Sequence, residues 1–306
     1  MAVQGLAATD AVITAFDDYL RRVRGIGSSA RQSYSRLARD FLEAVLGDGS
    51  VDLARLSVPD VVGFISEATS RYRPSTVQLH ATALRSFLRF LRSEGLREGH
   101  LEEAVPAVSR RRSASLPRHL GALDFARLIA SLDSSSPQGL RDRAIVLFAA
   151  RLGLRAGEIA RLRFDDLDWR SGTVRVRARK TGRGALLPLP YGVGEALAAY
   201  LERGRPASKD RHLFLLHRQR VGAPIDRHVA SDAVHRALRR AGIDAPARGT
   251  NLLRHSLATD LLAHGANLKQ IADLFGHRAL SSTQIYAKVD VAALRQAALP
   301  WPEVTW

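Results

Sequence analysis

The first hundred residues contain four stretches in which apolar side chains recur every three or four positions, the spacing of an amphipathic helix. Capping residues or prolines mark the start of each stretch, and glycines mark most of the ends. The predicted helices begin near Thr9, Ser28, Ser57 and Pro74. Four short amphipathic helices of this kind predict a compact helical bundle.

Helical periodicity is lost between residues 99 and 117. Pro106 and an arginine run at 110–112 interrupt it, which is typical of an exposed linker. A basic linker can be solvated or can follow a phosphate backbone, and the residues leave both interpretations open. We therefore predict a helical domain over residues 1–98, a basic linker over 99–117 and a second domain over 118–306.

The pattern of the second domain is helical apart from one β-hairpin. Residues 173–178 alternate between apolar and polar side chains, the period of a strand. A turn over 180–184 leads to a second strand at 185–189, so the hairpin has a cationic tip. We expect a further short strand at 212–216. Predicted helices lie at about 191–203, 226–241, 251–264, 268–275 and 281–287. The predicted fold class is therefore mainly α, with a small antiparallel sheet in the second domain.

Length and charge are consistent with two domains that bind a polyanion. A chain of 306 residues is long enough for two hydrophobic cores. Lysine and arginine number 46 against 30 acidic residues, a formal net charge of +16, and only four of the cations are lysines. An excess of this size favours nucleic acid as a partner. Aromatic residues make up 6% of the chain, which favours the backbone of duplex DNA over stacking on single strands.

Composition also excludes several classes of protein. The sequence has no cysteine, which excludes disulfides, thiolate metal sites and cysteine nucleophiles. Its longest apolar run, 144–150, has seven residues, far fewer than the roughly 18 that span a bilayer. Asp10 and Asp17 interrupt any apolar segment near the start, so no secretory signal peptide is predicted. We expect a cytoplasmic protein without a membrane partner.

Common enzyme signatures are missing from the sequence. It contains no Gly-x-x-x-x-Gly-Lys phosphate loop, no His-Glu-x-x-His and no Gly-x-Ser-x-Gly. Asp165, Asp166 and Asp168 form the one dense acidic cluster, which could hold the metal of a nuclease. Aspartates beside a turn more often cap the local backbone, so we interpret the cluster as a solvated turn. No metal or cofactor is predicted.

Three segments of the second domain place cations and a tyrosine at informative positions. Arg155 lies in a break just before a predicted helix, where a helix N-terminus favours an anion. Asn251 and Arg254 are three residues apart on one helical face. His277 follows the end of a predicted helix, and Tyr286 lies nine residues further on. Taken singly, these residues could equally be surface arginines and a half-buried core tyrosine.

Taken together, the segments resemble the tyrosine recombinase, or phage integrase, family and its Xer-like members in particular. The resemblance covers most of the chain. It implies an N-terminal SAM-like helical domain that grasps DNA and an α+β catalytic domain with the DNA breaking-rejoining fold. Four motifs carry it: Gly-Leu-Arg-x-Gly-Glu at 153–158, a hairpin lysine eight residues before Pro188, Leu-Leu-Arg-His-Ser at 252–256, and Gly-His-x-x-x-x-Ser-Thr-x-x-Tyr at 276–286.

The resemblance implies a site-specific recombinase that cleaves and rejoins duplex DNA without ATP. Tyr286 would attack the scissile phosphodiester, giving a 3′-phosphotyrosyl bond and a free 5′-hydroxyl. Arg155 and Arg254 would bind the phosphate oxygens through their guanidinium groups. Lys180 would protonate the departing 5′-oxygen, and His277 would hydrogen-bond a phosphate oxygen.

Two further positions have less definite roles. The family usually has histidine three residues before the second arginine, where this chain has Asn251. Asparagine can donate or accept a hydrogen bond but does not take up a proton near neutral pH. We expect activity to survive, because both arginines, the lysine and the tyrosine are present. Glu158 would either orient the arginines or lie on a helix surface.

The last residues of the chain suggest that several copies of the protein assemble. Trp301 and Trp306 lie in the last six residues, where exposed tryptophans are costly. The resemblance implies that this tail packs into a neighbouring copy within a homo-tetramer on two DNA sites, although it could instead pack on its own domain. The protein would then be associated with the nucleoid when bound to DNA.

Other functions remain open at the level of sequence. The chain could be a catalytically silent DNA-binding protein on the same frame, with Asn251 as a sign of lost activity. It could also act as a type IB topoisomerase, which shares the chemistry but needs no specific site. For a recombinase, as found in mobile elements, the residues do not distinguish integration, excision, transposition and dimer resolution.

Overall fold

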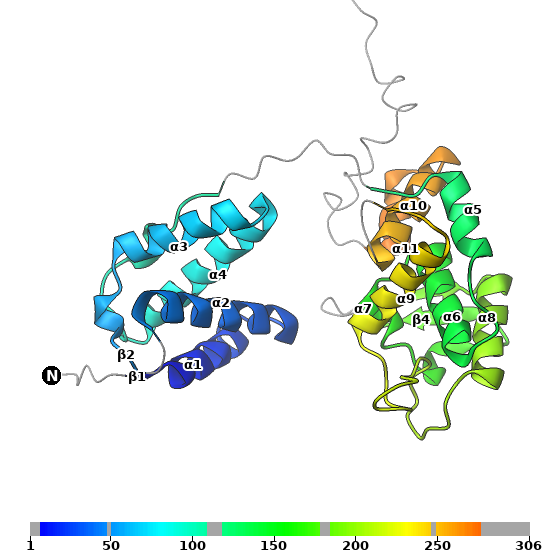
Figure 1. The fold of residues 1–306 in the computed structure, drawn as a ribbon, viewed down its shortest axis with the longest axis horizontal. Helices are drawn as coiled ribbons and strands as arrows, with labels where there is room; N and C mark the ends of the chain where they lie inside the picture. The colour runs from blue at the N-terminus through cyan, green and yellow to red at the C-terminus, as the bar shows by residue number, and fades with distance from the viewer. Residues whose placement is uncertain (1–6, 48–49, 109–117, 178–183, 246–248, 277–306) are drawn as a thin grey trace, which may run out of the picture. The chain divides into compact units, whose positions relative to one another are not determined.

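The computed structural model describes residues 7–47, 50–108, 118–177, 184–245 and 249–276. The chain separates into two compact units, Met1–Ala114 and Ser115–Trp306 (Figure 1). Within the described residues both units are mainly helical, and the second contains a three-stranded antiparallel sheet. The predicted fold class is confirmed. No helix in the described ranges is both long and apolar enough to cross a bilayer.

The first unit is a bundle of four helices. They start within one residue of the predicted positions. At the third helix the predicted capping residue is used, since the Ser57 amide donates to Asp60 Oδ2 at 2.9 Å, and a proline opens the fourth. Phenylalanines form its centre, with the rings of Phe16 and Phe87 edge to face at 5.1 Å. The helices are α1 (Thr9–Arg22), α2 (Ser28–Leu46), α3 (Val58–Arg71) and α4 (Pro74–Ser93), and a short pair joins β1 (Ala7–Ala8) to β2 (Ser50–Val51).

The first unit extends into the segment predicted as a linker. Leu101 and Val105 are buried in the core of this unit. The Arg85 guanidinium donates to the carbonyls of Val105 and Pro106, both at 2.8 Å. The chain therefore leaves the unit later than residue 99, and the arginine run at 110–112 lies outside the described residues.

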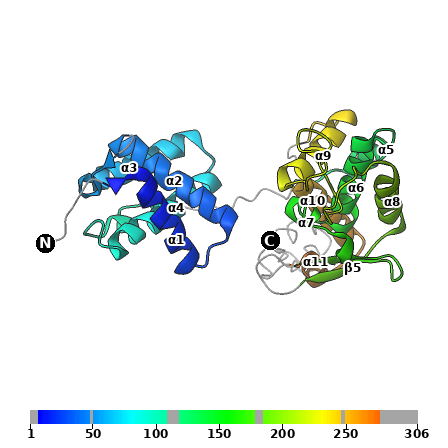
Figure 2. The ribbon, with the colours of Figure 1, turned by 90° about the horizontal axis from the view of Figure 1, so that it is seen from below.

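The second unit is built around one buried helix, α6 (Pro137–Leu152). All seven residues of the apolar run 144–150 are buried, as expected for a helix that is hydrophobic on every side. Figures 1 and 2 show other helices gathered around it. Its neighbours are α8 (Tyr191–Arg203), α9 (Arg227–Arg240) and α10 (Thr250–Ala263). Also present are α5 (Ala122–Ala130), α7 (Ala156–Ile159) and α11 (Leu268–Phe275).

The predicted hairpin is confirmed for its two strands. The sheet order is β3 (Leu167–Asp168), β4 (Thr173–Val176) and β5 (Ala185–Pro188), all antiparallel. Val174 and Leu187 face each other across β4 and β5 and are both buried. The tip of the hairpin, with Lys180, lies outside the described residues, as does the predicted helix at 281–287.

The strand expected at 212–216 is wrong. This segment makes two isolated bridges, from His212 to Arg163 and from Leu215 to Pro224, instead of a ladder. Its carbonyls bond to a side chain: the Arg205 guanidinium donates to the carbonyls of His212 at 2.9 Å and Leu213 at 3.2 Å. The apolar residues 213–215 are buried in the core, and this burial is what made the segment resemble a strand.

The acidic cluster caps the turn before β4. The Asp168 carboxylate accepts from the amides of Arg170 and Ser171, at 2.9 and 3.1 Å, and these hydrogen bonds, that from Ser171 foremost, lower the pKa of Asp168. Asp166 accepts from the Arg163 amide and pairs with Arg177. The predicted capping is confirmed, but Asp166 is buried and not solvated.

Candidate active site

The site begins at the turn between α6 and α7. Gly153 ends α6 in the left-handed conformation, with φ of 63°. A Cβ atom at this position would lie 2.5 Å from the Phe275 ring at the end of α11. Both the backbone angle and the lack of space therefore require glycine, and α11 packs directly against the turn that carries Arg155.

Arg155 is held at the start of α7 by Glu158. The two oxygens of the Glu158 carboxylate accept from the Arg155 backbone amide at 2.8 Å and from its Nη1 at 2.9 Å. The side chain of Glu158 is 14% exposed and that of Arg155 is 41% exposed. Glu158 thus holds one edge of the Arg155 guanidinium, while part of that side chain stays accessible to solvent. Of the two roles considered for Glu158, the geometry favours orienting an arginine.

Arg254 joins three segments that are far apart in the sequence. Its side chain is buried, with Nη1 donating to the Gly153 carbonyl at 2.7 Å and Nη2 to the Phe275 carbonyl at 2.8 Å. The guanidinium carbon also lies 3.9 Å from the centre of the Phe275 ring. The turn after α6, helix α10 and the end of α11 therefore meet at this one side chain. Directly after Phe275 comes Gly276, which ends α11 with φ of 60°.

A second hydrogen bond connects the starts of α7 and α10. The Ala156 amide donates to the Thr250 hydroxyl at 2.9 Å. The next residue, Asn251, is exposed. Asn251 and Arg155 line one cavity of about 250 Å³, whereas Arg254 lies in the core beside it. The lining residues are Arg155, Ala156, Gly157, Arg227, His228, Ser231, Gly249, Thr250 and Asn251.

The cavity has the chemistry of an anion site. Arg155 and Arg227 bring two guanidinium groups, and no aspartate or glutamate occurs among the described lining residues. The first turns of α9 and α10 border it. The Asp226 carboxylate caps α9, whereas no side chain caps α10, so the dipole of α10 adds positive potential. A phosphate group satisfies this arrangement better than a neutral ligand.

The structure brings together three of the six predicted site residues, namely Arg155, Asn251 and Arg254. Lys180, His277 and Tyr286 lie outside the described residues. Sequence reasoning missed Arg227 and His228 on α9. A usable signal was present, since Asp226 caps the helix and a basic pair follows it directly.

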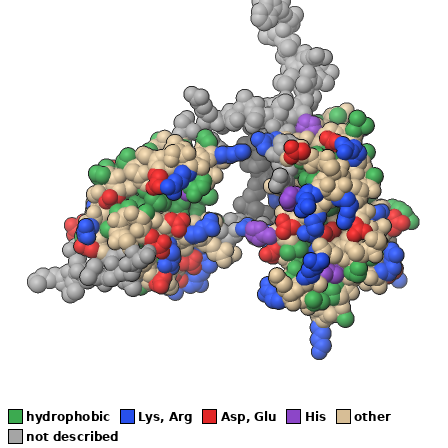
Figure 3. Space-filling model, viewed as in Figure 1, with side chains coloured by type: hydrophobic (Ala, Val, Ile, Leu, Met, Phe, Trp, Pro, Cys, Tyr) green, Lys and Arg blue, Asp and Glu red, His purple; other side chains and the backbone are tan. Residues whose placement is uncertain are grey.

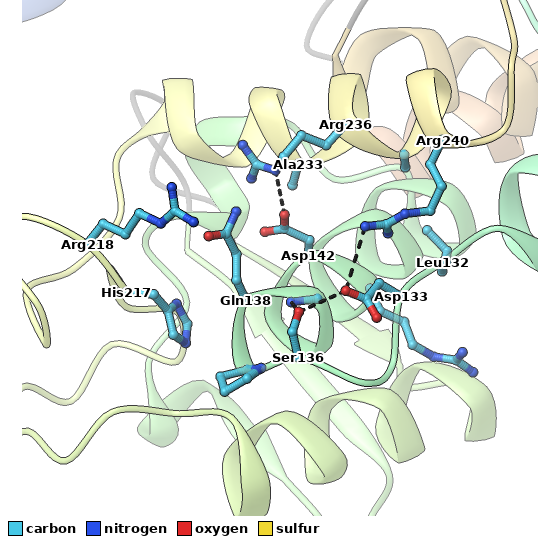
Figure 4. Close-up of a pocket in the computed structure, with 14 residues that line it drawn as sticks. Leu132, Asp133, Ser136, Gln138, Asp142, His217, Arg218, Ala233, Arg236 and Arg240 are labelled. Carbon is cyan, nitrogen blue, oxygen red and sulfur yellow. Dashed lines mark hydrogen bonds and ion pairs between the residues drawn. The ribbon is translucent and has the colours of Figure 1, made fainter.

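A larger cavity of about 490 Å³ lies at the other end of α6 (Figure 4). This end is about 24 Å from Gly153, at 1.5 Å per residue along the helix. Its charged groups mostly pair with one another: Arg236 Nε lies 2.7 Å from Asp142, which also binds Arg141. Asp133 has a pKa of about 2 because Ser135, through its amide and hydroxyl, and Ser136 donate to it. The Asp142–Arg236 pair joins α6 to α9, and the Asp133 contacts order the loop before α6, so we assign these groups a structural role.

Total charge alone would not locate the site. On the face shown in Figure 3, basic and acidic side chains are interspersed over the described parts of both units. The distinguishing feature is local: Arg155 and Arg227 line one cavity whose described lining residues include no aspartate or glutamate, although Glu158 pairs with Arg155 and Asp226 caps α9 close by.

Known proteins are similar to this chain over most of its length. A family model described as "Phage integrase family" matches residues 119–292, and one described as "Phage integrase, N-terminal SAM-like domain" matches residues 13–95. The integrase/recombinase y4rA of Sinorhizobium fredii is 42% identical over 296 residues, which cover 97% of this chain and 72% of that protein. Tyrosine recombinase XerD of Mycobacterium tuberculosis is 34% identical over 294 residues, covering 91% of this chain and 93% of XerD.

Solved structures share the fold. XerH site-specific recombinase bound to a palindromic difH substrate aligns with a TM-score of 0.70 at 20% identity, covering 95% of this chain and 85% of that one. A lambda integrase tetramer bound to a Holliday junction aligns with a TM-score of 0.69 at 16% identity, covering 98% and 81%. At these identities the likeness concerns the fold.

Proposed function

Because the chain belongs to the phage integrase family of tyrosine recombinases, as its four motifs predicted, we propose that it is a site-specific recombinase that cleaves and rejoins duplex DNA. The reaction forms a 3′-phosphotyrosyl intermediate. Tyr286 attacks the phosphorus and releases its phenolic proton to water, the bond to the 5′-oxygen breaks, and the departing oxygen takes a proton from Lys180. His277 donates a hydrogen bond to the phosphate. The covalent bond conserves the energy of the broken linkage, so rejoining needs no ATP.

One observation carries the proposal more than any other: the Arg254 side chain connects the turn of Arg155 to the end of α11. In the proposed reaction Arg155, Arg254 and His277, which follows α11, act on one phosphate. The segments that carry them must therefore meet. The cavity beside them is positive and lined by Arg155 and Asn251. Preorganised guanidinium groups stabilise the extra negative charge of a phosphorane transition state. In this role Arg155 binds phosphate oxygens in the cavity, Arg254 binds them from its buried place beside the cavity, and Asn251 contributes a hydrogen bond.

Covalent capture tests the function without knowledge of the natural target. Duplexes with a random central sequence and a nick in one strand are incubated with the full chain. The short fragment released by cleavage diffuses away, so the adduct accumulates. We expect a denaturant-resistant, protease-sensitive complex on a 3′-phosphate. Retention of duplexes without any adduct would favour the silent DNA-binding protein, and relaxation of plasmids at random positions would favour the topoisomerase.

Replacing Glu158 by glutamine tests how Arg155 is held. The carboxylate accepts two hydrogen bonds from Arg155, and the amide keeps only one strong acceptor and no charge. A charge-assisted hydrogen bond contributes about 1.5–3 kcal/mol, so we expect adduct formation on the captured duplex to slow by about tenfold or more. The control is Glu195→Gln, an exposed glutamate on α8. An adduct rate equal to that of the control would mean that Glu158 does not position Arg155.

We propose that the protein works as an assembly on DNA. The helical unit that contains residues 1–98 grips the duplex, the catalytic domain begins near residue 118, and four copies synapse two sites, with the tail of one copy docked on the next. The protein is then cytoplasmic and concentrated on the nucleoid; a fluorescent fusion spread evenly through the cell would contradict this location.

Removing the residues after Asp290 tests the role of the tail. If the tail docks on a neighbour, the shortened chain still binds one captured duplex, but it joins two duplexes into a synaptic complex at least about tenfold less well. Native gel mobility with one and with two labelled duplexes measures both steps. Equal loss of both steps would show that the tail packs on its own domain.

A further inference from the structure

We infer that His228 supplies the bound phosphate with the imidazole that position 251 lacks. The inference rests on the proposed function, because it assigns a further phosphate contact in the same cavity. Residue 251 of α10 is asparagine, where the family resemblance implies histidine. Asparagine donates a hydrogen bond but carries no charge, so a contact of the charge-assisted kind is missing there.

The structure places one histidine beside this position. His228 of α9 lines the same cavity of about 250 Å³ as Arg155 of α7 and Asn251 of α10. An anion bound between Arg155 and Asn251 therefore has His228 on the wall contributed by α9. The side chain of His228 is exposed, so no packed core blocks its approach to a ligand.

The backbone at His228 is fixed while its ring remains available. The amides of His228 and Val229 donate to Asp226 Oδ1 at 2.8 and 2.9 Å, which anchors the first turn of α9. The Nε2 atom of the ring accepts from Arg227 Nε at 3.3 Å. In the neutral ring the proton is then on Nδ1, which can donate to a phosphate oxygen.

Other described histidines of this unit do not replace it. His255 follows Arg254 directly but is half-buried, does not line the cavity, and has a pKa lowered by burial and by the nearby Arg254 and His119. His264 lies at the end of α10, where its ring bonds to the Asp260 carbonyl at 2.8 Å. Within the described ranges, His228 is the histidine that lines this cavity.

A double-mutant cycle tests the inference on the nicked duplex selected by covalent capture with the unsubstituted chain. We compare His228→Ala, Asn251→His and the double variant. His228→Ala should slow adduct formation by about tenfold or more, the effect of losing a hydrogen bond to a charged group. This loss should exceed any change in affinity for the same duplex with intact strands. Asn251→His should restore at least about tenfold in the His228→Ala background and speed the parent by a much smaller factor.

The control is His235→Ala, on the same helix but lining a different cavity of about 260 Å³. Thermal melting of each variant shows whether it is folded. An adduct rate for His228→Ala equal to that of the control would overturn the inference, as would equal gains from Asn251→His in both backgrounds. These outcomes leave the recombinase function intact. Failure of the unsubstituted chain to capture any duplex would instead contradict the function and the inference together.

Discussion

Tyr286→Phe abolishes the covalent protein–DNA adduct and leaves binding of the intact duplex in place. Phenylalanine keeps the ring of Tyr286 but lacks the oxygen that forms the bond to phosphorus, so no slower version of the same step remains. The expected signal is a loss to background of the labelled, denaturant-resistant band on the captured nicked duplex, with an unchanged shift in a native gel.

The matched control is Tyr191→Phe. Tyr191 begins α8 in the same unit, and 86% of the residue is exposed, so its hydroxyl can be removed without disturbing a core. An adduct that persists in Tyr286→Phe would show that another residue is the nucleophile. Loss of the adduct in both variants would point to damage unrelated to the chemistry.

Arg254→Lys lowers both the rate of adduct formation and the stability of the catalytic unit. The guanidinium of Arg254 donates to the carbonyls of Gly153 and Phe275 and stacks on the Phe275 ring. A lysine ammonium is a compact charge without the planar fork, and it cannot maintain all of these contacts. One buried carbonyl left without a partner costs about 1–3 kcal/mol, and loss of a preorganised donor slows catalysis by about 10²–10³-fold.

Two measurements separate the two effects. Urea unfolding gives the free energy of unfolding, and single-turnover capture gives the adduct rate of the folded protein at low denaturant. The control is Arg203→Lys, at the exposed end of α8. A destabilised variant that still forms adduct at the parent rate would restrict Arg254 to a structural role.

Much of this architecture could be predicted because its signals are local. The helix starts near Ser57 and Pro74 depend on a capping box and on a proline in the first turn, signals that lie beside each start in the sequence. The same holds for Arg155, whose place before α7 is marked by Gly153, two residues earlier, at the end of α6. Spacing alone also placed Asn251 and Arg254 on one helix, but it did not show that the first is exposed and the second buried.

Contacts between distant segments could not be predicted in this way. Nothing near Phe275 in the sequence indicates that its carbonyl accepts from Arg254 or that its ring fills the space beside Gly153. Asp166 was expected to be solvated. Its burial and its partner were not visible from the sequence, because Arg177 lies eleven residues further on, just after β4. His228 was missed for a similar reason, since only the packing of α9 against α7 brings it beside Arg155.

The buried helix α6 has a consequence for the energetics of DNA binding. It is held on several sides by α8, α9 and α10, and the turn with Gly153 and Arg155 begins where it ends. The conformational entropy lost in ordering this turn is therefore lost when the protein folds and not when it meets a substrate. More of the interaction energy with the phosphate is then available to lower the activation barrier.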